Sequence, residues 1–102
     1  MEKLSIFRRE LDDLDEQLMQ ILARRFDVCR QVASYKAQMN IPMMQPARVA
    51  EVKERAVKRG SAVGLSPQFA VELYNLIISE ACRMEDEIIE RTKANEPAKA
   101  DI

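Results

Sequence analysis

The sequence of 102 residues contains no histidine. This absence excludes Ser/His/Asp and Cys/His nucleophile arrangements and removes the most frequent general base of enzymes. The only cysteines, Cys29 and Cys82, are too few for a disulfide framework and are not spaced as a metal site. We interpret both as small buried hydrophobic residues. Any chemistry must therefore use carboxyl groups, amides, arginines and lysines, and we expect no metal and no cofactor.

Residues that favour turns and sheets are also scarce. The chain has two glycines, four prolines and 5% aromatic residues, which disfavours a turn-rich β fold. Leu, Ile, Val, Ala, Glu, Lys and Arg dominate instead, and they are typical of a helical protein. With 47% hydrophobic and 32% charged residues, the sequence predicts one all-α domain near the small end of the size range, with a thin core of its own.

The charge balance and the lack of long apolar runs exclude further classes. The formal net charge is −1, with acidic and basic residues interleaved, so no broad basic face is available to bind nucleic acid. No apolar run approaches the roughly 20 residues that cross a bilayer, and the N-terminus MEKLSIFRRE lacks the apolar core of a signal peptide. We therefore expect a cytoplasmic protein with no membrane partner.

Capping and breaking residues predict three helices. The first spans about residues 4–39 and ends where Asn40 and the following Ile-Pro pair disfavour helix. The second begins at Pro46, a residue suited to the first helical position, and ends before Gly60, which we interpret as a left-handed cap. Ser66 caps the third, which continues to about Arg91.

The domain organisation is simple. The sequence contains no internal repeat, and residues 1–92 are predicted to form one helical domain. The last ten residues, KANEPAKADI (93–102), carry too little apolar surface to pack, so we predict a disordered tail there.

The first predicted helix carries the strongest pattern. Alternating steps of three and four give an apolar seam interrupted by a single charge, at Arg25. At about 1.5 Å per residue this helix is roughly 54 Å long, about twice the span of a small domain, and two shorter helices cannot cover it. The seam therefore predicts an intertwined homodimer. The residues of the seam are Leu4, Phe7, Leu11, Leu14, Leu18, Ile21, Arg25, Val28, Val32 and Tyr35.

Arg25 has two interpretations, which the pattern alone leaves open. It is either a snorkelling or register-setting charge, or a guanidinium that grips a carboxylate in a two-pronged bond. Lys36, three turns further on, points within roughly 20° of the same direction and favours the second interpretation. Arg8 points about 100° away from Arg25. If Arg8 serves the same pocket, it does so from the partner chain or from another wall of the pocket. The competing interpretation is a solvated arginine that pairs with Asp12.

Candidate groups on the other helices complete the set. Glu85 has apolar neighbours on the flank of the third helix, which raises the pKa of a carboxyl and lets it donate a hydrogen bond when protonated. Pairing with a lysine or arginine is the competing interpretation, and Glu80 is the main rival as an interior acid. Arg48, on the first turn of the second helix, extends an anion-binding region of unpaired backbone N–H groups. Together, Arg25, Lys36, Arg48 and Glu85 suit a small dicarboxylate and need no nucleophile.

Over nearly all of residues 4–90, the sequence resembles the all-helical chorismate mutases, which are small three-helix intertwined dimers. The matching segments are FRRELDDLDEQL, ILARRFDVCRQVASYK, the arginine of PARV and LYNLIISEACRMED. Their order and spacing carry the resemblance, and the family's series of three arginines and a lysine falls on Arg8, Arg25, Lys36 and Arg48.

The resemblance implies a unimolecular [3,3] rearrangement, in which an ether C–O bond breaks while a C–C bond forms. Catalysis then means binding the reactive chair and stabilising negative charge on the ether oxygen. By analogy, Arg25 and Arg8 of the partner subunit grip the two substrate carboxylates. Lys36 and a protonated Glu85 approach the ether oxygen.

The sequence departs from the typical family pattern around the second helix. Gln45 and Val49 stand where typical members carry acids that recognise the C4 hydroxyl of the substrate, and Ala81 replaces a common serine. The combination of IPMMQPxR with EACRMED looks most like the 4-amino-4-deoxychorismate mutases, so we place that substrate slightly ahead of chorismate. A valine after the arginine also occurs in isochorismate pyruvate-lyases of this fold, which rank third. A non-catalytic helical dimerisation module is the competing class.

Overall fold

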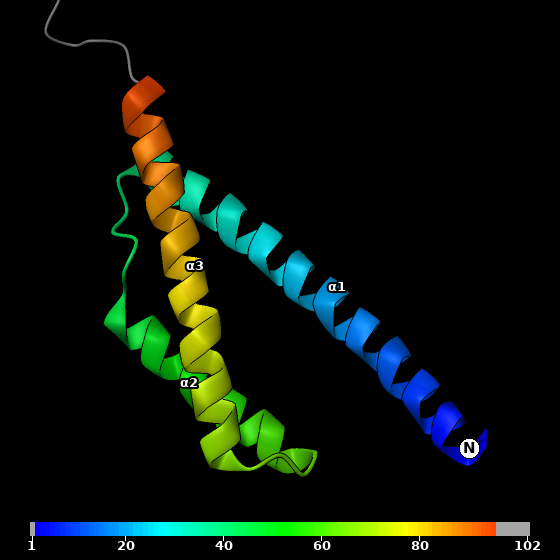
Figure 1. Ribbon diagram of the computed structural model, residues 1–102. Coiled ribbons are helices and arrows are strands. Elements are labelled where there is room, and N and C mark those ends of the chain that lie inside the picture. The colour runs from blue at the N-terminus through cyan, green and yellow to red at the C-terminus, as the bar shows by residue number, and fades with distance from the viewer. Residues whose placement is uncertain (1, 96–102) are drawn as a thin grey trace, which may run out of the picture.

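The longest element is α1 (Glu2–Met39), a single helix of 38 residues that projects well beyond the rest of the molecule (Figure 1). The computed structural model describes residues 2–95. Within them lie two further helices, α2 (Pro46–Ala62) and α3 (Pro67–Asn95), and no strand. The prediction of an all-α fold of three helices, one of them very long, is confirmed.

α3 holds the three helices together. It packs against α2 and against the C-terminal half of α1, whereas α1 and α2 do not pack on each other within the described part of the chain. The N-terminal half of α1 diverges from α3 and forms an open arm (Figure 1). The molecule extends 72 × 29 × 15 Å with a radius of gyration of 18.8 Å, against about 13 Å for a compact domain of this size. One chain alone is therefore an open scaffold.

The core is as thin as the composition predicts. No side chain among the described residues is both large and fully buried, and four of the six buried hydrophobic residues are alanines. α3 contributes Ala70, Ile77, Ala81 and Met84, spaced by seven, four and three residues, a spacing that keeps them on one helix face. Small residues on this face let α3 approach the other two helices closely.

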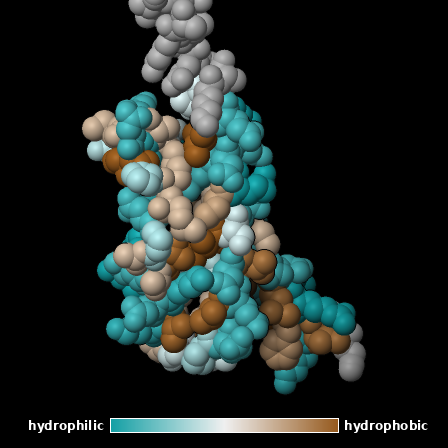
Figure 2. Space-filling view, turned by 90° about the vertical axis from the view of Figure 1, so that its left-hand side faces the viewer, coloured by the Kyte–Doolittle hydropathy of each residue, from teal (hydrophilic) through white to brown (hydrophobic). Residues whose placement is uncertain are grey.

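The apolar seam of α1 faces solvent in the single chain. Its nine apolar members are between 41% and 58% exposed, and Ala33 is the only residue of α1 that is buried. Figure 2 shows apolar side chains along the arm that projects at the lower right. On α3, Phe69 and Leu76 are likewise exposed, at 45% and 72%. Apolar surface of this extent is typical of an interface with another chain.

The end of α1 agrees with the sequence. Asn40 adopts a positive φ of 55°, and the N–H of Ile41 donates to the carbonyl of Lys36 at 2.9 Å. Helices commonly end in this way, with a left-handed residue and a backbone hydrogen bond that spans the last turn. Six residues then lead to Pro46, which occupies the first position of α2 as predicted.

The predicted end of the second helix was wrong. α2 continues through Gly60 to Ala62, and Gly64, with φ of 86°, is the left-handed residue. The N–H of Leu65 donates to the carbonyl of Gly60 at 2.9 Å, which closes the helix end. Leu65 also packs over Gly60, and this apolar contact favours the later end.

The start of α3 was predicted correctly. The Oγ of Ser66 accepts the backbone N–H of Phe69 at 3.0 Å, as a capping residue does. α3 runs on to Asn95, past the expected end at Arg91, so it includes the first three residues of the segment 93–102 that we predicted to be a disordered tail. The rest of that segment lies outside the described residues.

Candidate functional site

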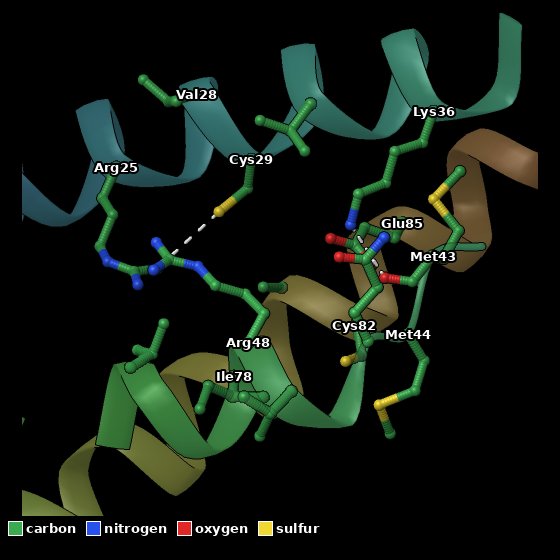
Figure 3. Close-up of a pocket in the computed structure, with 15 residues that line it drawn as sticks. Arg25, Val28, Cys29, Lys36, Met43, Met44, Arg48, Ile78, Cys82 and Glu85 are labelled. Atoms are coloured by element: carbon green, nitrogen blue, oxygen red, sulfur yellow. Dashed lines mark hydrogen bonds between the residues drawn. The ribbon is translucent and has the colours of Figure 1, made fainter. Parts of the chain in front are cut away.

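The main pocket lies where the C-terminal half of α1, the start of α2 and the middle of α3 meet (Figure 3). Its volume is about 440 Å³, within the range of small-molecule sites. Seven of the eight site residues proposed from the sequence line it, and they come from all three helices and the turn between α1 and α2. They are Arg25, Lys36, Gln45, Arg48, Val49, Ala81 and Glu85.

Arg25 is half-buried, and its guanidinium lies inside the pocket (Figure 3). Its Nη1 lies 3.8 Å from the Sγ of Cys29, one helix turn further on. Its Cζ lies 5.6 Å from the ring centroid of Tyr74 on α3, a distance suited to a cation–π contact. Arg25 is thus held by its own chain at the pocket wall. Sequence reasoning missed Tyr74, because nothing in the pattern of α3 marks which residue of α1 lies opposite.

Lys36 shares the pocket with Arg25, as the helix geometry predicts for residues eleven apart. Its Nζ donates to the backbone carbonyl of Met43 at 3.0 Å, in the turn that follows α1. Figure 3 shows the ammonium group beside the carboxyl of Glu85. The cation is therefore fixed within the pocket by a neutral acceptor.

Glu85 is the only carboxyl group among the residues that line this pocket. Partial burial raises the pKa of Glu85, the charge of Lys36 opposes this shift, and the charge of Asp86 adds to it. The direction agrees with the expectation from its apolar neighbours. Glu80, the rival acid, lies outside the pocket and pairs with the exposed Arg83.

Arg48 enters the pocket from the first turn of α2. Its Nη1 donates to Glu51 Oε1 at 2.7 Å, and Arg55 Nη2 lies 2.9 Å from the same oxygen. Glu51 does not line the pocket. It therefore does not replace the acids that typical family members carry at the positions of Gln45 and Val49. The pocket carries three cations and one carboxyl group with a raised pKa, which favours an anionic ligand.

The prediction that both cysteines are buried in the core was wrong. Cys29 and Cys82 are half-buried, and both line the pocket instead of the core. The buried residues of α1 and α3 include Ala33 and Ala81, whereas both cysteines remain partly exposed. Burial raises the pKa of the Cys82 thiol, and the charges of Glu85 and Asp86 raise it further. A thiol in this state is a poor nucleophile, which agrees with a site that needs none.

Arg8 is the one proposed residue that the pocket does not include. It lies on the exposed arm of α1, 17 residues before Arg25, which is about 26 Å along a helix. Arg8 of the same chain therefore does not reach the pocket from this position.

The remaining pocket wall is apolar, with Met43, Met44, Ile78 and Val52 among its members. Sequence reasoning assigned Val52 no role in the site, because its position at the pocket depends on how α2 packs against α3. Within residues 2–95, no group of His, Cys, Asp and Glu side chains is arranged to hold a metal ion. No helix in the same range is both long and apolar enough to span a bilayer.

Comparison with known proteins agrees with this geometry. Residues 7–86 match the family described as chorismate mutase type II. The chain is 44% identical over 89 residues to a 4-amino-4-deoxychorismate mutase of Streptomyces venezuelae, covering 87% of this chain and 86% of the relative. It is 40% identical over 86 residues to a protein of the same name from Streptomyces pristinaespiralis, covering 84% and 67%. A bifunctional chorismate mutase/prephenate dehydratase of Aquifex aeolicus is 32% identical over 91 residues, which are 86% of this chain and 25% of that protein. The chain therefore belongs to the chorismate mutase type II family and is an isomerase of the chorismate mutase type.

Proposed function

We propose that this isomerase acts on 4-amino-4-deoxychorismate and converts it to the corresponding amino prephenate. The observation that carries the proposal is the composition of the pocket: three cations with Glu85 as the only carboxyl group, and Gln45 and Val49 in place of acids. The two relatives named 4-amino-4-deoxychorismate mutase support the choice of substrate. Chorismate is the second candidate.

The reaction has one step and no covalent enzyme intermediate. The ether C–O bond of the substrate breaks as a C–C bond forms between the two ends of the folded molecule, and every atom stays in the product. The enzyme accelerates this step by holding the chair conformation and by stabilising the charge that develops on the ether oxygen. Lys36 donates to that oxygen from one side, and protonated Glu85 donates from the other.

The arginines bind the two carboxylates of the substrate. Arg25, restrained by Tyr74 and Cys29, offers a two-pronged contact to one of them. Arg8 of the partner subunit binds the other, because Arg8 of the same chain lies far along α1. Arg48 adds positive charge at the start of α2 and exchanges its bond to Glu51 for the ligand.

Recognition at C4 of the ring falls to Gln45 and Val49. The side-chain carbonyl of Gln45 can accept a hydrogen bond from an amino group, and its side chain does not cap α2, so it is available. Val49 contributes apolar surface where typical family members carry a charge. The same carbonyl can bind a hydroxyl at C4, so the two relatives named 4-amino-4-deoxychorismate mutase carry the preference for the amino compound.

The functional unit in this proposal is an intertwined homodimer of the domain formed by residues 1–92. The exposed seam of α1 and the exposed Phe69 and Leu76 of α3 supply the interface. A second copy covers them and brings its own Arg8 to the pocket. The two free thiols, Cys29 and Cys82, fit the reducing conditions of the cytoplasm, where we place the protein.

The decisive experiment is to incubate the purified protein separately with 4-amino-4-deoxychorismate, chorismate and isochorismate and to identify the products by mass and retention time. We expect rearrangement of the amino compound with the highest kcat/KM, slower rearrangement of chorismate, and no release of pyruvate from isochorismate. A higher kcat/KM for chorismate would reverse the order of the first two candidates. Release of pyruvate as the main reaction would assign the lyase activity instead.

A further inference from the structure

The turn after α1 is attached twice to one residue, Lys36. The backbone carbonyl of Lys36 accepts the N–H of Ile41 at 2.9 Å, and its Nζ donates to the carbonyl of Met43 at 3.0 Å. Met43 lies seven residues after Lys36, so the chain turns back toward Lys36 between these two residues. The reversal occurs at Asn40, and the position of the Met43 carbonyl depends on it.

Asn40 adopts a conformation that side chains rarely take. Its φ is 55°, and it is the only non-glycine residue with a positive φ in residues 2–95. Asparagine tolerates the left-handed region better than most residues, and glycine adopts it without cost. Such a conformation persists where the surrounding structure requires it, and it is common near functional sites.

The bond to Met43 is notable because a carboxyl group is nearby. Figure 3 shows the ammonium of Lys36 beside Glu85, yet none of the ion pairs among the described residues joins the two. The Nζ of Lys36 donates instead to the neutral carbonyl of Met43. A direct ion pair between Lys36 and Glu85 would keep Glu85 ionised and would engage both groups with each other.

We infer that Asn40 is a positioning residue whose left-handed turn places the Met43 carbonyl so that it holds Lys36 away from Glu85. The two groups then do not engage each other, and both remain available to donate to the same oxygen of the substrate when Glu85 is protonated. This inference rests on the proposed function for the role of that oxygen. The positioning of Lys36 itself rests on the two hydrogen bonds and the backbone of Asn40.

The other charged and titratable groups around Glu85 do not replace Lys36 in this role. Arg25 on α1 is held by Tyr74, and Arg48 on α2 is paired with Glu51. On α3, Asp86 and Cys82 bring no positive charge, and the charge of Asp86 raises the pKa of Glu85. Burial raises the pKa of Glu85 most, and Lys36 is the cation whose charge lowers it.

The test compares Asn40→Val, which disfavours the left-handed turn, with Asn40→Gly, which keeps it. Gly64→Val is the control for backbone strain, because it places valine at another positive φ, 86°, in the turn between α2 and α3, where nothing lies within 4 Å of an added Cβ. Asn40→Ala is a milder version in case the valine variant does not fold. Two quantities are measured: the pKa of Glu85 by carbon-13 NMR titration of its carboxyl group, and kcat and KM for 4-amino-4-deoxychorismate.

We expect Asn40→Val to lower the pKa of Glu85 and to reduce kcat by about tenfold, with a smaller change in KM. Asn40→Gly keeps the original values, and Gly64→Val loses stability without changing either quantity. An unchanged pKa of Glu85 in Asn40→Val and Asn40→Ala would overturn the inference, as would equal effects in Gly64→Val. If the unsubstituted protein turns over no substrate, the proposed function fails, and the NMR titration still decides the positioning of Lys36.

Discussion

The guanidinium of Arg25 on α1 lies over the ring of Tyr74 on α3, with 5.6 Å between Arg25 Cζ and the ring centroid. The contact joins two helices at the wall of the pocket and orients the cation that we assign to a substrate carboxylate. Such contacts stabilise by about 0.5–1 kcal/mol where solvent is close. The orientation of Arg25 is therefore a testable consequence of the packing of α1 on α3.

Replacing Tyr74 with leucine is expected to weaken substrate binding by about two- to fivefold, because Arg25 loses the ring that orients it. Tyr74→Phe keeps the aromatic face and serves as the matched control, with affinity near that of the unsubstituted protein. Isothermal titration with substrate or a stable dicarboxylate analogue measures the effect. Equal affinities for the leucine and phenylalanine variants would show that the ring does not orient Arg25.

Replacing Arg25 with alanine separates the two interpretations of this charge in the seam. If Arg25 grips a carboxylate, kcat/KM falls by about a hundredfold or more while the oligomeric state stays unchanged. The control is Arg24→Ala, which removes the same charge from an exposed neighbour that does not line the main pocket. Kinetics and sedimentation are measured on both variants. A changed oligomeric state with normal turnover per folded site would instead assign Arg25 to helix register.

Mixing two inactive variants tests whether Arg8 acts across the dimer. Arg8→Ala and Arg25→Ala chains are unfolded together and refolded at equal concentration, so that half of the dimers are mixed. Each mixed dimer then contains one intact site, and about a quarter of the original activity returns. If Arg8 served the pocket of its own chain, no mixed dimer would contain an intact site, and activity would stay at the level of the separate variants.

The pH dependence of kcat is expected to follow Glu85. Burial raises the pKa of this carboxyl, and the mechanism requires the protonated form as a donor. Activity is therefore highest below the pKa of Glu85 and falls by about tenfold per pH unit above it, because the ionised carboxylate repels the charge on the ether oxygen. Glu85→Gln removes this decline, since an amide donates at every pH, whereas Glu80→Gln on the same helix leaves it in place. A decline that persists in Glu85→Gln would assign it to another group.

The sequence predicted the elements of the fold better than their contacts. The helix boundaries at Met39, Pro46 and Ser66 followed from local chemistry, because a break or cap depends on residues within one turn. The end of α2 did not, since Gly60 and Gly64 are both acceptable caps in isolation. The choice depended on Leu65, which packs over Gly60.

The candidate site shows the same division. The spacing along α1 by itself placed Arg25 and Lys36 on one side of a helix, because helix geometry fixes the direction of side chains eleven residues apart. Only the tertiary structure decided that Tyr74 supports Arg25, that the Met43 carbonyl holds Lys36, and that both cysteines face the pocket. The contact of Arg25 with Tyr74 and the placement of the cysteines depend on how α3 packs against α1 and α2, and the bond of Lys36 to Met43 depends on the turn after α1. Sequence periodicity carries no information about that packing, because it describes each helix separately.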